Sequence, residues 1–167
     1  FDETTGGRII HSVNQVGGVQ RDMDSAMLKH LLETIRDIER DLKPLVDTFL
    51  KDYTVQSRLK GTGILKKDDA ILLGAVGPML RASGVEYDAR VLGYGAYKHL
   101  SVEPIISADG DCYGRCEVRL KELFQSFALI REAIGKIPEG DIRVPVKGNP
   151  SGEYFLRIEQ PRGEAIY

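Results

Sequence analysis

Met27–Phe49 reads MLKHLLETIRDIERDLKPLVDTF, and this stretch decides the fold. Its apolar residues recur every three or four positions, which is the spacing of one helical face, and the charged residues of Arg36–Asp41 fill the other side. Asp22 and Asp24 offer side chains that can cap the start of this helix. Pro44 lies inside the pattern and removes a backbone donor, so we predict a kink or a break there.

A second long helix is predicted to open at Asp109 or Asp111 and to close at Pro138-Glu139-Gly140. Two amphipathic helices of this length bury their apolar faces most simply against each other. The apolar stripe of this second helix consists of Cys112, Cys116, Leu120, Leu123, Phe127, Ile130, Ile134 and Ile137.

Shorter elements are expected around this pair. Helical spacing of Ile9, Ile10, Val13 and Val16 predicts a short helix that Thr5 caps and Gly17-Gly18 ends. Lys66-Lys67-Asp68-Asp69 leads into an apolar segment that ends near Gly77-Pro78, which predicts a helix of about two turns. From Arg81 to Ala108 the pattern is irregular and predicts a long loop that packs against another part of the molecule.

The C-terminal part predicts a small β-hairpin. Ile142, Val144 and Val146 alternate with other residues, positions 148–152 supply a turn, and Tyr154–Ile158 returns as the second strand. No internal repeat or linker divides the chain. The expected fold is therefore mainly α, in the α+β class, with packed long helices, shorter helices and a small C-terminal hairpin in a single domain, 1–167.

Composition excludes several classes of function. Apolar residues make up 42% and charged residues 29%, so the chain can build a core and is not a disordered segment. The net charge of -2 and the lack of aromatic residues among lysines speak against nucleic-acid binding. Two cysteines are too few for a disulfide scaffold, which favours a reducing cytoplasmic setting.

Cys112 and Cys116 are the first candidates for metal or redox chemistry. Their spacing of four places both on the apolar stripe of a helix, where a reduced cysteine acts as a small hydrophobic residue. No third or fourth ligand is obvious nearby, so core packing is the favoured interpretation and a ligand or redox role is the alternative. His11, His30 and His99 are scattered and predict no metal site or catalytic triad.

Two further motifs have structural explanations. Gly61-Thr62-Gly63 followed by Lys66 and Lys67 lacks the spacing of a phosphate-binding loop. The charged residues around the start of the second long helix are typical of caps and of ion pairs on a helix face. They are Asp109, Asp111, Arg115, Glu117 and Arg119.

Arg162 stands at a sharp corner of the sequence, between Pro161 and Gly163. Proline restricts the backbone and glycine tolerates unusual angles, so this corner can aim a guanidinium at one fixed target. The alternative is an ordinary hairpin arginine paired with Glu159 or Glu164.

Five ordered motifs resemble one protein family. The chain is similar to the large subunit of membrane-bound energy-converting [NiFe] hydrogenases and to its relative, the 49 kDa quinone-site subunit of respiratory complex I. The resemblance runs nearly end to end. Its motifs are RIIHSVNQVGGV (8–19), RLKGTG (58–63), GPMLRASG (77–84), GDCYGRCEVRLKE (110–122) and EQPRGE (159–164).

This resemblance implies that the chain is the central fragment of a longer large subunit. In the hydrogenases a nickel-iron centre is held by two C-x-x-C pairs, and neither pair occurs here, so we expect no metal or other cofactor in this fragment. The P-R-G motif of that family places an arginine over the metal's open position. By this match Arg162 and the backbone of Pro161 are the expected catalytic residues, with an electrostatic role.

The resemblance implies an oxidoreductase, and the first hypothesis is a hydrogenase that oxidises or evolves hydrogen coupled to ion pumping. A quinone-reducing complex I subunit is the second hypothesis, and a non-catalytic scaffold the third. The implied partners are a small iron-sulfur subunit and membrane ion-pump subunits, which places the protein on the cytoplasmic face of the cell membrane. Apolar surface left open in a fragment is expected to support self-association.

Overall fold

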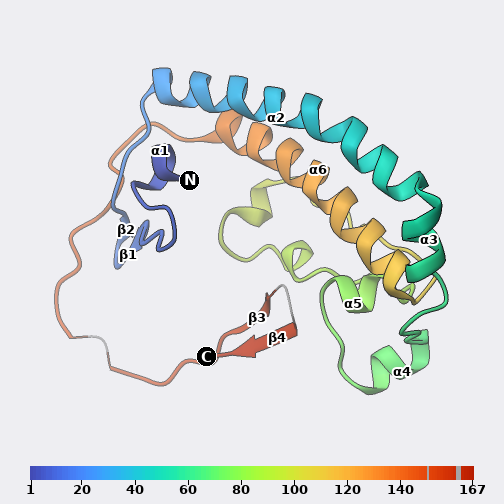
Figure 1. Ribbon diagram of the computed structural model, residues 1–167. Coiled ribbons are helices and arrows are strands. Elements are labelled where there is room, and N and C mark those ends of the chain that lie inside the picture. Colours follow the sequence, from blue (N-terminus) through green and yellow to red (C-terminus); the bar gives the residue numbers. More distant parts are fainter. Residues whose placement is uncertain (150, 161–162) are drawn as a thin grey trace.

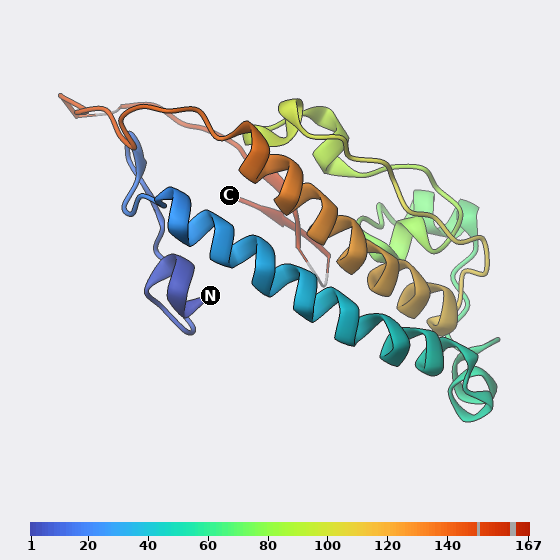
Figure 2. The same cartoon turned by 90° about the horizontal axis from the view of Figure 1, so that it is seen from above.

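Two long helices form the body of the molecule. The computed structural model describes residues 1–149, 151–160 and 163–167. Helices α2 (Ser25–Lys51) and α6 (Cys112–Lys136) pack side by side and run in opposite directions (Figure 1). The same pairing is visible from above in Figure 2. The predicted α+β class and the predicted pair of packed long helices are both confirmed.

Helix α2 begins where the sequence predicts, because the Asp24 carboxylate accepts a hydrogen bond of 2.8 Å from the Met27 N–H. It then continues through Pro44 as one element, so the alternative of a break was wrong. Pro44 is exposed, and water can therefore hydrogen-bond the Arg40 carbonyl that loses its partner. The chain breaks at Asp52 instead, which caps the short helix α3 (Tyr53–Leu59).

Apolar side chains of α2 and α6 form part of the core. Ile35 and Val46 of α2 are buried, and so are Val118, Phe127 and Leu129 of α6. Burying one such side chain contributes about 1.5–3 kcal/mol. An ion pair between Glu39 and Arg131 joins the same two helices across their partly exposed margin.

The start of α6 is held by the loop that precedes α4 (Lys67–Leu72). Asp111 is buried and accepts 2.9 Å and 2.8 Å hydrogen bonds from the N–H groups of Gly114 and Gly61. Gly110 next to it has a φ of +66°, and a Cβ there would lie 2.6 Å from the Leu65 oxygen. The Gly61-Thr62-Gly63 segment therefore organises a helix start, in agreement with the capping role predicted for Asp111.

The long loop after α5 (Pro78–Arg81) packs on α6, as predicted. It contains two short 3-10 helices, η1 (Ala89–Leu92) and η2 (Gly95–His99). Glu132 of α6 accepts hydrogen bonds from the backbone and side chain of Ser101, at 2.9 and 3.0 Å. The hydrogen bond from Lys136, together with those from Ser101, lowers the pKa of Glu132 to about 2.

The predicted helix between Thr5 and Gly17 was wrong. Helix α1 covers only Asp2–Thr5 and ends at Gly6, whose φ is +75°. The following chain forms a small antiparallel pair, β1 (Asn14–Gln15) with β2 (Gly18–Val19). Ile9 is 89% exposed, so the apolar repeat in this region does not mark a buried helical face.

The predicted C-terminal hairpin exists, but its strands lie elsewhere. Strand β3 (Arg157–Gln160) pairs antiparallel with β4 (Gly163–Ile166), and Glu159 lies opposite Glu164. The expected first strand at 142–146 contains Pro145, which cannot donate to a sheet. Its residues instead run beside β2, where the Val19 N–H donates to the Ile142 oxygen at 3.0 Å. In Figure 1 the β3–β4 hairpin lies on the side of α6 away from α2.

Apolar side chains remain exposed on the described surface, for example Leu72 at the end of α4, Leu73 directly after it, and Phe155 before β3. Self-association through such surface stays a prediction. None of the helices in the described ranges combines the length and the apolar character that a membrane crossing requires.

Candidate functional site

A buried arginine connects three separate parts of the chain. Arg81, at the end of α5, is 3% exposed. Its Nε donates to Oε1 of Glu122 on α6 at 2.6 Å, and its Nη1 donates to Oε2 of Glu159 on β3 at 3.0 Å. The same Nη1 also donates to the Tyr87 carbonyl oxygen at 3.2 Å. One guanidinium thus fixes a helix, a strand and a loop relative to each other.

Asp88 lies beside this arginine and is fully enclosed, with a side-chain exposure of 0%. Arg90 binds it with two parallel contacts, Nε to Oδ1 at 2.9 Å and Nη2 to Oδ2 at 2.6 Å. Such bidentate pairs are the strongest arrangement between arginine and a carboxylate. Nη2 of Arg90 also donates to the Gln125 side-chain oxygen at 3.0 Å, which attaches η1 to α6.

The charges of this network stabilise each other. Burial by itself would raise the pKa of Asp88, but hydrogen bonds from Arg90 and the charges of Arg81 and Arg90 hold it below its usual value. Burial likewise opposes the charge of Arg81, yet the Glu122 and Glu159 carboxylates raise its pKa. Every fully buried side-chain nitrogen and oxygen in the described residues has a hydrogen-bond partner.

The lowered pKa of Asp88 predicts a specific acid sensitivity. Because the native state favours the ionised carboxylate, its stabilisation is complete above the ordinary value of 3.8 and is lost as the pH falls through the lower native value. Asp88→Asn removes this titration, so the variant should lose less stability than the wild type between about pH 4 and pH 2. Urea unfolding at several acidic pH values measures how steeply the free energy of unfolding falls with pH in each protein. The same pH dependence in the variant and the wild type would contradict the lowered pKa of Asp88.

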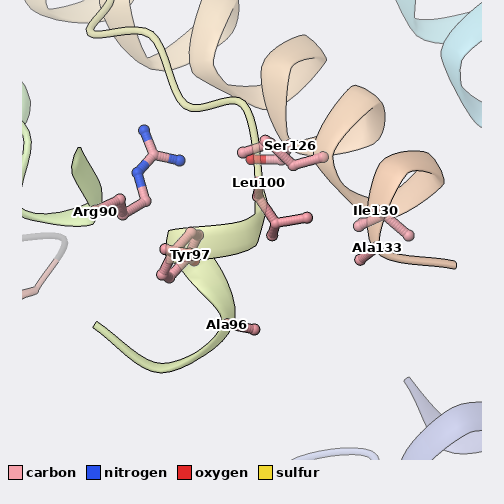
Figure 3. A pocket seen from close by; sticks show the side chains of 8 residues that line it. Arg90, Ala96, Tyr97, Leu100, Ser126, Ile130 and Ala133 are labelled. Atoms are coloured by element: carbon pink, nitrogen blue, oxygen red, sulfur yellow. The ribbon is translucent and has the colours of Figure 1, made fainter. Parts of the chain in front are cut away.

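Arg90 lines two of the cavities along this network. One of about 360 Å³ is lined by Arg81, Arg90, Glu122 and Glu159 together with tyrosine side chains from the loop. The second, of about 370 Å³, shares Arg90 with the first and is otherwise mostly apolar. Figure 3 shows it between η2 and α6, with Tyr97 on one side and Ile130 on the other.

The predicted catalytic residues, Pro161 and Arg162, lie outside the described residues, and their roles stay predictions. The two carboxylates proposed as ordinary partners of Arg162 both have other partners. Glu159 binds Arg81, and Glu164 forms an ion pair with Arg157 across the hairpin.

The two cysteines lie half-buried on α6, where the sequence pattern predicts them. Sγ of Cys112 accepts a 3.1 Å contact from Nη2 of Arg115. In the described ranges, no three side chains of His, Cys, Asp or Glu gather closely enough to hold a metal ion. The described residues therefore do not fit a nickel-iron centre, which needs several thiolate ligands.

Comparison with known proteins assigns the family. The sequence matches the family described as the 49 kDa subunit of respiratory-chain NADH dehydrogenase over residues 1–148. The chain belongs to this 49 kDa subunit family. The resemblance inferred from the five motifs is thereby confirmed, and with it an oxidoreductase complex as the family's setting.

Relatives of the 49 kDa family include both branches considered from the sequence. An NADH-quinone oxidoreductase subunit of Bacteroides thetaiotaomicron is 37% identical over 98% of this chain and 32% of its own length. The membrane-bound hydrogenase alpha subunit of Pyrococcus furiosus is 33% identical over 100% of this chain and 43% of its own length. The chain thus spans less than half the length of either relative.

A solved structure shows that the fold is shared as well. A chain of the membrane-bound sulfane sulfur reductase, an archaeal respiratory membrane complex, has a TM-score of 0.84 and 30% identity to this chain. The match covers 93% of this chain and 45% of the other.

Sequence reasoning missed the buried network that the 49 kDa family member contains. Arg81 and Glu122 fall inside quoted motifs, but the partners of Arg81 are 41 and 78 positions away from it along the chain. No local periodicity connects residues at such separations. The available signal was an arginine in the apolar GPMLRASG motif, because a buried arginine requires a carboxylate partner.

Proposed function

We propose that this chain is part of the 49 kDa-type subunit of a membrane-associated respiratory complex that reduces quinone. The observation that carries the proposal is the family match over residues 1–148, together with relatives named as NADH-quinone oxidoreductase subunits. These comparisons favour the quinone reaction over the hydrogenase, which was the first hypothesis from the sequence.

The chemistry of quinone reduction suits the residues at the end of β3. Reduction of a quinone to a quinol takes two electrons and two protons, and negative charge develops on the quinone oxygens. A guanidinium supplies permanent positive charge and several donors to such an oxygen. In this proposal Arg162 supplies that charge beside the backbone of Pro161, and the Arg81 network fixes the strand that leads to them.

The electrons in this proposal come from a partner subunit. We infer a small iron-sulfur subunit as the electron donor and membrane ion-pump subunits as further partners, with the chain at the cytoplasmic face of the membrane. Relatives named as parts of respiratory complexes support these partners.

A hydrogenase is the second candidate because of the 33% identity to the Pyrococcus furiosus hydrogenase subunit. A nickel-iron centre would require thiolate ligands from outside this chain, since the described residues do not fit one. We therefore derive no chemical step through such a centre from these residues.

The complete coding sequence of the subunit tests the choice between the two candidates. The quinone proposal expects that the regions flanking these 167 residues lack the two C-x-x-C pairs that hold nickel in the hydrogenases. Two such pairs would overturn it in favour of the hydrogenase.

A further inference from the structure

In the part of the chain that the structure describes, one side chain makes the hydrogen bonds between the hairpin β3–β4 and the helical body, while apolar residues such as Leu156 and Ile158 line a cavity with Val76 and Leu92. Most of its hydrogen bonds are internal, such as the pair between the backbones of Leu156 and Tyr167 at 2.9 Å. Among the described residues, Glu159 supplies the hydrogen bonds that join the hairpin to the helices and the long loop. Its Oε2 accepts from Arg81 Nη1 and its Oε1 accepts from the Ala89 N–H, both at 3.0 Å.

The two donors that hold Glu159 are themselves fixed. Arg81 is bound on its other side by Glu122 of α6, and Ala89 is the first residue of η1. The side chain of Glu159 is only 16% exposed, so water competes weakly for these charge-assisted hydrogen bonds. The described strand β3 is therefore held by hydrogen bonds from α5 and η1, and the α5 donor is itself bound to α6.

We propose that Glu159 is a positioning residue for the function proposed above, because it fixes the end of β3 on the helical body through Arg81. Gln160, the next residue, is the last residue of the strand. A displacement of about 1 Å of a reacting group can cost about a hundredfold in rate, so the anchor of this strand affects turnover without contacting the substrate. This inference rests on the proposed function, but the anchoring itself can be measured separately.

Glu159→Gln tests the proposal in the complex that contains the complete subunit. The amide keeps the size of the side chain and an oxygen for the Ala89 N–H, but it removes the charge that pairs with Arg81. We expect amide hydrogen exchange of residues 156–167 to become at least about tenfold faster, while exchange in α2 and α6 is unchanged. We also expect kcat to fall about tenfold or more with KM within about twofold of the wild type.

Two further variants complete the design. Glu159→Asp keeps the charge on a shorter side chain and should recover part of the lost kcat. Glu164→Gln is the matched control, because it removes an ion pair within the same hairpin and leaves the hydrogen bonds of Glu159 to Arg81 and Ala89 in place. This control should keep kcat and the exchange of residues 88–91 at wild-type values.

Two results would overturn the proposal. Unchanged exchange of residues 156–167 in Glu159→Gln would show that Glu159 is not the anchor. Faster amide exchange of these residues with an unchanged kcat would show that Glu159 anchors the hairpin but does not position a group for the reaction. Each variant is compared with the wild-type complex in the reaction that the wild-type complex performs, either quinone reduction or hydrogen evolution. If that reaction is hydrogen evolution, the quinone proposal fails, but the role of Glu159 can still be measured.

Discussion

Arg81→Ala is expected to lower the free energy of unfolding by about 3–5 kcal/mol, the usual cost of breaking a buried ion pair from one side. The substitution leaves the carboxylates of Glu122 and Glu159 without their shared partner, and it removes one of the two arginines that pair with the buried Asp88. Urea unfolding followed by circular dichroism measures the loss.

The matched control is Arg40→Ala on α2. Arg40 also binds two carboxylates, Asp37 and Asp41, but its side chain is 67% exposed and water replaces the lost contacts. The unfolding midpoint of this control should stay close to that of the wild type. Equal destabilisation by the two substitutions would mean that burial does not set the strength of the Arg81 network.

Arg162→Lys is expected to lower turnover of the complete complex by about a hundredfold, which is typical for loss of a fixed donor to a developing negative charge. Lysine keeps the positive charge but lacks the planar set of five donors, so it cannot reproduce the same geometry. Steady-state turnover with quinone as the acceptor, measured on assembled complex, gives the effect. Stability of the complex should be unchanged.

The control for this experiment is Arg157→Lys on the same hairpin. Arg157 is 65% exposed and pairs with Glu164 on the neighbouring strand, so turnover should stay near the wild-type rate. If Arg162→Lys also turns over at the wild-type rate, the reaction does not need the fixed planar set of donors that the Arg162 guanidinium supplies.

The long helices could be predicted because their signals are local. Asp24 and Asp111 lie at the starts of α2 and α6, and the apolar residues between each start and end repeat with the helical period. The break predicted as an alternative at Pro44 failed because an exposed proline leaves a carbonyl that water can satisfy. The period of apolar residues was therefore a stronger signal than a single proline.

The strands could not be placed from local patterns. Ile142 and Val144 alternate like strand residues, yet their partners are Gly17, Gly18 and Val19 near the other end of the chain. A pattern with a period of two residues indicates an extended backbone, but it does not identify the pairing partner. The hairpin was predicted in the right region for this reason, but with the wrong strands.

The candidate site could not be predicted fully either, because its contacts join residues that are far apart in the sequence. The corner at Pro161-Gly163 was visible in the sequence, whereas the anchor at Glu159 became visible only when Arg81 and Ala89 were brought beside it. Closeness in sequence made Glu159 a candidate partner of Arg162. In the described structure Glu159 pairs with Arg81 of α5, and the burial of this arginine strengthens the pairing.

The most direct test of the account is the reaction of the purified complex itself. Reduced electron donor is supplied to assembled complex, quinone reduction and hydrogen evolution are measured in parallel, and nickel is determined by elemental analysis of the same sample. We expect quinone reduction without hydrogen evolution and without stoichiometric nickel. Hydrogen evolution by a complex with stoichiometric nickel would contradict it.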